Sequence, residues 1–209
     1  VLLENRDMVL SGFLMTLRLL FFSGLGAMAI GIIVATMRIA PMAALRSFAA
    51  GYTEVVRNTP LVMVFLFTVF VAPLIFPLRL PYEVIAIITL SVYTSPFVAE
   101  ALRSGINGVP VGQAEAARSI GLTFTQTLRI VVLPQAMRMV VPPLINVFIA
   151  LAKNTSVAGG FFVAELFYTN ANGQAVVPIL FGIAVCYLAI TVPLGLIAYG
   201  VEKKVRVLK

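Results

Sequence analysis

Histidine is absent from this sequence, and cysteine and aspartate occur once each, as Cys186 and Asp7. One cysteine cannot close a disulfide within the chain, and the common zinc sites need histidine or several cysteines. Without histidine, a hydrolytic site would need two aspartates or a serine–lysine pair. Lys153 near Ser156 is such a pair, but its spacing is common at helix ends. We therefore expect no metal site and no catalytic residues, and for Cys186 a packed core position.

A phosphate-binding loop is missing as well. The pattern Gly-x-x-x-x-Gly-Lys-Ser/Thr, whose backbone amides cradle phosphates, has no match, and no glycine is followed by lysine in this sequence. The chain is therefore predicted to bind no cofactor and not to be an enzyme. Any step driven by ATP and magnesium must use a site on another polypeptide.

Charged residues are also scarce, at 11% of the sequence, whereas apolar residues make up 61% and the mean hydropathy is +1.06. Soluble domains contain about 45 to 50% apolar residues, so this composition indicates an integral membrane protein. The length of 209 residues leaves no room for a separate soluble enzyme domain. We predict an all-α polytopic fold, one transmembrane domain over 1–209 with five spans at about 9–37, 52–76, 84–102, 134–152 and 176–201.

Positive charges divide unevenly between the two sides that five spans define. The side of the C-terminus is predicted to carry Arg38, Arg46, Arg57, Arg103, Arg118, Arg129, Arg138, Lys203, Lys204, Arg206 and Lys209. The other side carries Arg6, Arg79 and Lys153. Lys and Arg concentrate in cytoplasmic loops, so we expect the N-terminus outside and the C-terminus in the cytoplasm. The net charge of +7 is a signal of topology and gives no support to nucleic-acid binding.

The longest segment that cannot lie in lipid covers residues 107–133. Pro110 suits a helix start and Gly121 suits the left-handed turn that ends a helix, which predicts a short helix between them. Thr123 and Gln126 have the spacing of a capping box, which predicts a second helix directly afterwards. Two short helices that meet at a glycine turn form a hairpin suited to docking on another protein.

Within this segment, Glu115-Ala116-Ala117, Gly121, Val131 and Leu133-Pro134 are separated by three, nine and one residues. The spacing is similar to the EAA loop of ABC-importer permeases, the coupling helix that docks on the ATPase subunit. One position departs, since the family usually has isoleucine where this chain has Val131. The resemblance implies that the coupling residues are Glu115, Ala116, Ala117, Gly121, Leu133 and Pro134. The alternative is an amphipathic helix lying in the membrane interface.

Four further segments resemble the polar amino-acid branch of these permeases: T-x-R at 16–18, R-N-T-P-L at 57–61, F-V-A-E-x-x-R-S-G-I at 97–106 and K-N-T-S at 153–156. The likeness covers about residues 10–205, and the run from 97 to 119 is similar to glutamate importers of Gram-positive actinobacteria. The resemblance implies a type I ABC importer permease fold in a bacterial cell membrane.

The implied function is import of a polar amino acid, with glutamate favoured and glutamine or basic amino acids as alternatives. The implied partners are a second permease chain, identical or homologous, two cytoplasmic ATPases that bind ATP and magnesium, and an extracellular solute-binding protein. A self-contained secondary transporter is the alternative of a different class, and it would usually need internal repeats and more helices.

Two polar segments, Arg57-Asn58-Thr59 and Lys153-Asn154-Thr155-Ser156, each place a cation beside an amide and a hydroxyl. An amino acid needs donors for its carboxylate and acceptors for its ammonium group, held in a largely apolar cavity. We expect the second segment to break the fourth span and line the substrate path. Lys153 or backbone amides would bind the carboxylate, residues 154–156 would be adaptable partners, and Glu165 would bind the ammonium group. Alternatively, residues 154–156 cap a helix end and Glu165 pairs with Lys153. We expect the first segment to form a structural gate.

Three local patterns concern helix packing. Glu100 and Arg103 lie three apart at the end of the third span, which predicts a structural ion pair. Pro60 has no N–H and should free a backbone carbonyl near Val56. Small residues that let a neighbouring helix approach recur every four residues along the first span, at Ser23, Ala27 and Gly31.

Overall fold

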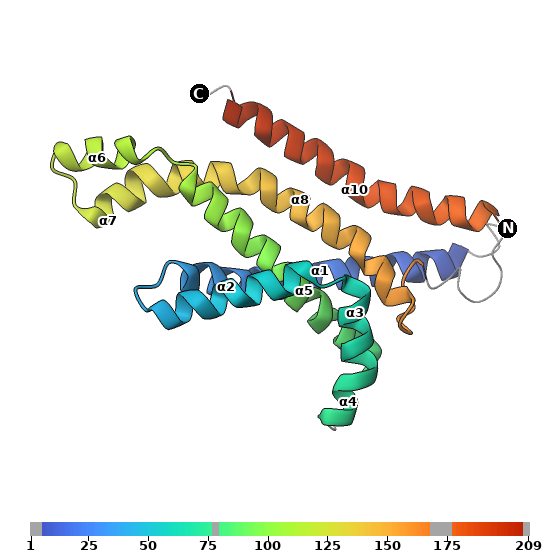
Figure 1. Ribbon diagram of the computed structural model, residues 1–209. Coiled ribbons are helices and arrows are strands. Elements are labelled where there is room, and N and C mark those ends of the chain that lie inside the picture. Colours follow the sequence, from blue (N-terminus) through green and yellow to red (C-terminus); the bar gives the residue numbers. More distant parts are fainter. Residues whose placement is uncertain (1–5, 77–79, 168–176, 207–209) are drawn as a thin grey trace.

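The computed structural model describes residues 6–76, 80–167 and 177–206, which form helices joined by short turns (Figure 1). In chain order the elements are α1 (Arg6–Arg38), α2 (Ala43–Asn58), α3 (Leu61–Leu66), η1 (Phe67–Val71), α4 (Ala72–Ile75), α5 (Tyr82–Asn107), α6 (Val111–Ser119), α7 (Phe124–Gln126), η2 (Thr127–Val132), α8 (Leu133–Gly159) and α10 (Val177–Arg206). The elements η1 and η2 are π-helical, so their turns are wider than those of an α-helix. Arg79, Lys209 and the predicted helix start at residue 176 lie outside the described residues.

The predicted all-α membrane fold is confirmed. Within the described ranges, the helices long and apolar enough to cross a membrane are Arg6–Arg38, Tyr82–Asn107, Phe124–Gly159 and Leu180–Lys204. Ala43–Asn58 and Leu61–Ile75 meet at 103° and pass the same test as a pair. If this bent pair counts as one span, the described residues contain the five spans that were expected.

The predicted start of the second span is wrong. α2 begins at Ala43, well before residue 52, and includes much of the stretch between the first two predicted spans. The stretch is rich in alanine, the strongest helix former, and its polar residues Arg46 and Ser47 are exposed. As a result Arg57, expected near the start of a span, lies in the last turn of α2.

The predicted break in the fourth span is also wrong, because α8 continues to Gly159. The Thr155 hydroxyl donates to the Ala152 carbonyl over 2.8 Å, and the Ser156 hydroxyl donates to the Lys153 carbonyl over 2.7 Å. These hydroxyls therefore find partners inside the helix and do not compete with its backbone bonds.

Pro60 turns the chain and does not leave the Val56 carbonyl free. Thr59 and Pro60 have extended backbone, with ψ of 129° and 135°, so α2 ends there and α3 starts in a new direction. The Thr59 N–H donates to the Val56 carbonyl over 3.3 Å. The expected orphan carbonyl is absent because the helix stops before the proline reaches its interior.

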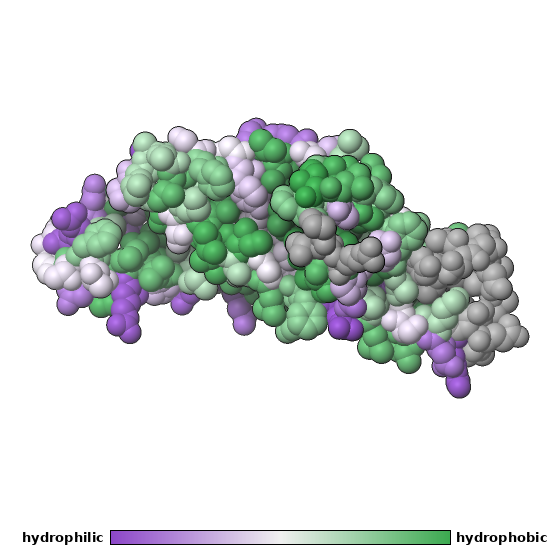
Figure 2. Space-filling view, turned by 90° about the horizontal axis from the view of Figure 1, so that it is seen from below, coloured by the Kyte–Doolittle hydropathy of each residue, from purple (hydrophilic) through white to green (hydrophobic). Residues whose placement is uncertain are grey.

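The long helices run along the length of the molecule (Figure 1). The connection between α1 and α2 and the elements α6 and α7 lie toward one end, which we call the hairpin end; the start of α1 and the last residues of α8 lie toward the other. In Figure 2, with the hairpin end on the left, the middle of the molecule is mostly hydrophobic and hydrophilic side chains gather toward the left.

α1 and α5 pack closely through the small residues that the sequence indicated. Ser23, Ala27 and Gly31 are all buried, and the Ser91 hydroxyl of α5 donates to the Ser23 carbonyl over 3.3 Å. A Cβ atom added to Gly31 would lie 2.6 Å from the Val98 Cγ1 atom. The expectation of a close helix contact along this face is confirmed.

α5 and α8 cross just before α6, at Gly105. A Cβ atom at Gly105 would overlap the Val140 side chain and lie 3.0 Å from the Val140 backbone nitrogen. One turn farther, a Cβ on Gly108 would lie 2.8 Å from the Met139 sulfur. The two helices therefore meet almost backbone to backbone, at the base of α6 and α7.

Replacing Gly31 by alanine should destabilise the protein, because the new methyl group would lie 2.7 Å from the Val98 Cβ atom. Overpacking of this kind costs about 1 to 3 kcal/mol, which exceeds the gain of about 0.5 to 1 kcal/mol in helix propensity. The thermal unfolding midpoint of the purified protein in detergent measures the change.

Gly195 in α10 provides the matched control, because a Cβ atom there meets nothing within 4 Å. Gly195→Ala should leave the midpoint unchanged or raise it. Equal destabilisation by both substitutions would contradict the close contact between α1 and α5.

Candidate functional site

The hairpin, formed by α6 on one arm and α7 with η2 on the other, is held by local hydrogen bonds. α6 follows the extended Pro110 and ends at Ser119, two residues before Gly121, whose φ is +94°. The Gly121 N–H donates to the Arg118 carbonyl over 3.0 Å, and the Leu122 N–H donates to the Ala117 carbonyl over 3.2 Å. These two bonds form a Schellman motif, so the predicted glycine turn is confirmed.

The second arm begins at the predicted capping box. The Thr123 hydroxyl accepts from the Gln126 N–H over 3.3 Å, and the Gln126 side-chain oxygen accepts from the Thr123 N–H over 2.9 Å. From Phe124 the helix continues through η2 into α8, ending at Gly159 after 36 residues. The arm is therefore rigidly joined to a membrane-spanning helix.

The hairpin buries one side of α6 and exposes the other. Ala117 is buried, whereas Glu115 and Ala116 are exposed. Two large apolar side chains flank the turn in the open, Ile120 at 81% and Phe124 at 72% exposure. Leu133 and Pro134 lie at the base of the second arm and are also exposed. A rigid projection with apolar side chains and one carboxylate outward is suited to docking on a protein surface.

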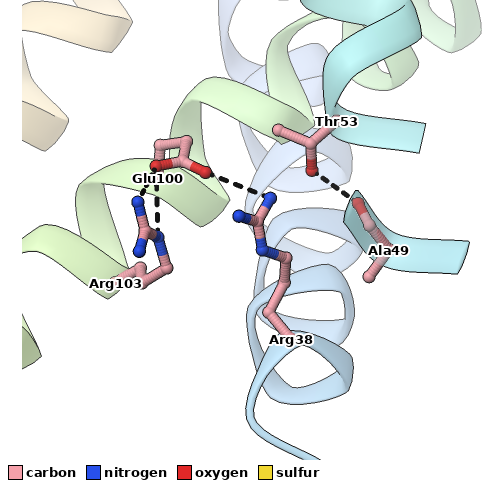
Figure 3. Close-up of polar contacts among 5 residues, drawn as sticks. All are labelled: Arg38, Ala49, Thr53, Glu100 and Arg103. Carbon is pink, nitrogen blue, oxygen red and sulfur yellow. Dashed lines mark hydrogen bonds and ion pairs between the residues drawn. The ribbon is translucent and has the colours of Figure 1, made fainter. Parts of the chain in front are cut away.

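Glu100, near the end of α5, binds two arginines (Figure 3). Its Oε2 atom accepts from the Arg103 Nη2 atom over 3.0 Å, which is the contact expected from their spacing. Its Oε1 atom lies 3.2 Å from the Nη1 atom of Arg38, at the end of α1. Sequence reasoning missed Arg38, because no local spacing links it to Glu100. The carboxylate therefore joins α1 to α5 where α5 approaches the hairpin.

A groove of about 290 Å³ lies between α5 and α8. Its described lining consists of Tyr93, Thr94, Phe97, Asn146, Val147, Ala150, Leu151 and Asn154. The Arg57 guanidinium carbon lies 5.6 Å from the centre of the Phe97 ring, so a cation borders the groove. The Thr94 hydroxyl is buried and has no hydrogen-bond partner among the described residues. The groove therefore presents polar groups within a largely apolar wall.

Of the residues predicted for a substrate path, Asn154 lines this groove and Arg57 borders it, whereas their neighbours do not. The Asn58 side chain donates to Glu54 and the Thr59 hydroxyl donates to the Val55 carbonyl, each over 2.8 Å. Asn58 and Thr59 thus complete the end of α2. Lys153 is exposed, and Thr155 and Ser156 donate their hydroxyl protons within α8. The spacing of Asn146, Ala150 and Asn154, four residues each, is the signal that would have found the groove face of α8.

Glu165 lies in a buried cluster between α1 and α10. Its carboxylate accepts from the Tyr187 hydroxyl over 2.6 Å, from the Phe167 N–H over 2.7 Å and from the Thr16 hydroxyl over 3.4 Å. Glu165 is fully buried, so these donors stabilise a carboxyl group shielded from water. The contacts indicate that Glu165 ties the segment after α8 to α1 and α10. Cys186, expected in the core, is partly buried beside this cluster.

The described part of the chain contains no cluster of three or more His, Cys, Asp or Glu side chains able to hold a metal ion. Three parts of the structure remain as candidates for function: the hairpin, the Glu100 cluster and the groove. α5 takes part in the last two and leads directly into the first.

Comparisons with known proteins agree on one kind of molecule. A family model described as a binding-protein-dependent transport system inner membrane component matches residues 27–207. The glutamate transport system permease protein GluC of Corynebacterium glutamicum is 41% identical over 204 residues, covering 90% of each chain. The probable glutamine ABC transporter permease protein GlnP of Bacillus subtilis is 36% identical over 206 residues, covering 95% of this chain and 94% of its own. A crystal structure of an amino acid ABC transporter with histidines is similar with a TM-score of 0.88 and 28% identity, over 97% of this chain and 96% of that chain.

The Arg38–Glu100 pair should stabilise the fold more than the Arg103–Glu100 pair. It joins two helices, and its arginine side chain is 22% exposed, compared with 44% for Arg103. Exposed ion pairs contribute about 0.2 to 1 kcal/mol. Double-mutant cycles with Arg38→Gln, Arg103→Gln and Glu100→Gln, followed by thermal unfolding, should give a coupling energy of about 1 kcal/mol for Arg38 and a smaller one for Arg103.

The Arg6–Asp7 pair supplies a reference for this measurement. Its side chains are 78% and 92% exposed, and its atoms lie 3.5 Å apart, so its cycle should show no measurable coupling. A coupling energy for Arg103 larger than that for Arg38 would show that Glu100 acts within α5 and does not join the two helices.

Proposed function

Because the chain belongs to the family of binding-protein-dependent transport system inner membrane components, and is the permease of an amino-acid ABC importer, we propose that its substrate is glutamate. The chain itself is not catalytic, and its family implies ATPase and binding-protein partners. The composition of the groove is the observation that supports glutamate as the substrate. It offers amides, a hydroxyl and aromatic rings beside Arg57, and no carboxylate among its described lining residues.

Glutamate carries two carboxylates and one ammonium group, so its site needs more donors than acceptors. Arg57 supplies a guanidinium group, and the Phe97 ring keeps that group at the groove. The side chains of Asn146 and Asn154 each provide two donors and one acceptor. The Thr94 hydroxyl, which is buried and has no partner among the described residues, lies in the wall of the groove. The ammonium group of the substrate is received by amide oxygens and by the face of an aromatic ring.

Glutamine is the nearest alternative, since the probable glutamine permease GlnP is 36% identical to this chain. The two substrates differ in the charge of one side-chain group, and Arg57 is the residue that favours the anion. Basic amino acids fit less well, because a cationic side chain would lie beside Arg57 with no carboxylate among the described lining residues. The relative named for glutamate transport, at 41% identity, supports the same choice.

In the proposed orientation the hairpin faces the cytoplasm and the N-terminus lies outside, as the distribution of positive charges predicts. Glu115, Ala116 and the exposed Ile120 and Phe124 then form the surface that docks on an ATPase. A second permease chain, identical or homologous, docks on the other ATPase. When ATP draws the two ATPases together, the hairpins move, and α5 and α8 tilt because the hairpin connects them. The groove between these helices is then exposed to one side of the membrane at a time.

Uptake by vesicles that hold the whole complex, with binding protein at saturation, tests the substrate. Glutamate should be imported in preference to glutamine, and arginine should not be imported. Arg57→Gln should lower the ratio of glutamate to glutamine uptake about tenfold, the size expected for losing a charge-assisted hydrogen bond.

Lys204→Gln removes a positive charge from an exposed position in α10 and should leave this ratio unchanged. Preferred import of arginine would contradict the proposed substrate class. An unchanged ratio in Arg57→Gln would move the site for the side-chain carboxylate to another residue.

The turn of the hairpin should be required for coupling. At Gly121 the φ of +94° suits glycine, so Gly121→Val should deform the turn and let ATP hydrolysis proceed without uptake. Gly121→Asn should retain most coupled uptake, because asparagine tolerates positive φ better than other side chains. Uptake per ATP hydrolysed is the measurement, with assembly checked by co-purification of the ATPase.

Gly112→Val is the control within the same hairpin, since a Cβ atom there meets nothing within 4 Å and its φ lies outside the positive range. Normal coupled uptake by Gly121→Val at normal expression would remove the turn from its proposed role.

A further inference from the structure

Pro96 interrupts the hydrogen bonds of α5 near the middle of the helix. Proline has no backbone N–H, so the carbonyl of Val92, four residues earlier, loses the donor that a regular helix supplies. Thr94, Ser95 and Pro96 are all buried. A buried carbonyl without a donor is costly, above all in a membrane protein, so it must find its donor in a side chain.

Two hydroxyl groups supply that donor. The Ser95 hydroxyl, within α5, donates to the Val92 carbonyl over 2.9 Å. The Tyr52 hydroxyl, from α2, donates to the same carbonyl over 3.0 Å and lies 2.7 Å from the Ser95 hydroxyl. The two hydroxyl groups and the carbonyl oxygen thus make three short contacts with one another, and each hydroxyl has one proton to donate. The serine alone would bond the carbonyl locally, so the tyrosine adds a link between two helices.

A second contact between α2 and α5 lies five residues farther along both helices. There the Arg57 guanidinium carbon is 5.6 Å from the centre of the Phe97 ring. Phe97 lines the groove, whereas Tyr52 bonds the backbone just before the proline. α2 is thus attached to α5 on both sides of Pro96, and its second attachment carries the cation of the groove.

We propose that Tyr52 is a positioning residue for transport, whose hydroxyl holds α2, and with it Arg57, on the proline hinge of α5. Helices bend most readily at proline. The part of α5 that follows Pro96 carries Glu100 and leads through Gly105 into the hairpin. When the hairpin moves, α5 bends at Pro96, and the Tyr52 bond makes α2 follow the bend. The inference rests on the chain acting as the permease of an ATP-driven importer, and it does not depend on the choice of glutamate.

Tyr52→Phe removes the hydroxyl and keeps the ring. In vesicles that hold the complete complex, ATP hydrolysis should continue while the amount of amino acid imported per ATP falls about fivefold, the size expected for losing one hydrogen bond between membrane helices. The readout is this ratio, measured with whichever amino acid the complex imports, so it stays separate from the test of substrate. Tyr199 in α10 is 67% exposed, and the matched change Tyr199→Phe should keep the wild-type ratio.

Pro96→Ala tests the chemical reason, because alanine returns an N–H that can bond the Val92 carbonyl. In the Pro96→Ala background, Tyr52→Phe should cause no further fall in uptake per ATP and no further fall in unfolding temperature. Equal losses from Tyr52→Phe in both backgrounds would overturn the proposal, because the tyrosine would then act through something other than the orphaned carbonyl. A wild-type ratio in Tyr52→Phe alone would overturn it too. Tyr52→Phe leaves the Ser95 hydroxyl on the Val92 carbonyl, so the variant should still assemble, and failure to assemble counts against the proposal.

Discussion

Every carbonyl and N–H group of a helix in the membrane has to be bonded inside the protein, and this constraint shapes the unusual parts of the chain. At Pro60 the helix ends, and the Thr59 N–H bonds the Val56 carbonyl. At Pro96 the helix continues, and a tyrosine from a neighbouring helix provides a donor. Just before Pro134 the helix widens into η2, and the Gln135 side chain donates to the Val131 carbonyl over 2.9 Å. Each of these prolines therefore marks a place where the chain bends, links helices or changes its helical pitch.

Sequence reasoning succeeded where the bonds are local. The glycine turn at Gly121, the capping box at Thr123 and the pair formed by Glu100 and Arg103 all join residues within a few positions, so their spacing predicts them. It failed where the partner is distant in sequence. Tyr52 lies 40 residues from Val92, and nothing in the sequence around Glu100 points to Arg38. Such contacts follow from how the helices pack, which hydropathy and spacing do not determine.

The prediction of the substrate path shows a second limit. It treated residues 153–156 and Glu165 as parts of one site because they are polar and close in sequence. Successive residues of a helix point about 100° apart, so Asn154 lines the groove while Thr155 is buried elsewhere in α8. Glu165 is held by Thr16 and Tyr187, which fixes the segment after α8. The low hydropathy of residues 153–156 predicted a helix end, but the Thr155 and Ser156 hydroxyl groups bond carbonyls within the helix, which continues.

The helix from Phe124 to Gly159 is continuous over 36 residues, and its Val140 packs directly on Gly105 of α5. At 1.5 Å per residue, Val140 divides it into arms of about 24 Å and 29 Å. The contact with Gly105 therefore lies near the middle of this helix. In the proposed import cycle, a tilt about this contact would carry the hairpin and the far end of the helix in opposite directions, and Pro142 and Pro143 mark where the helix would bend.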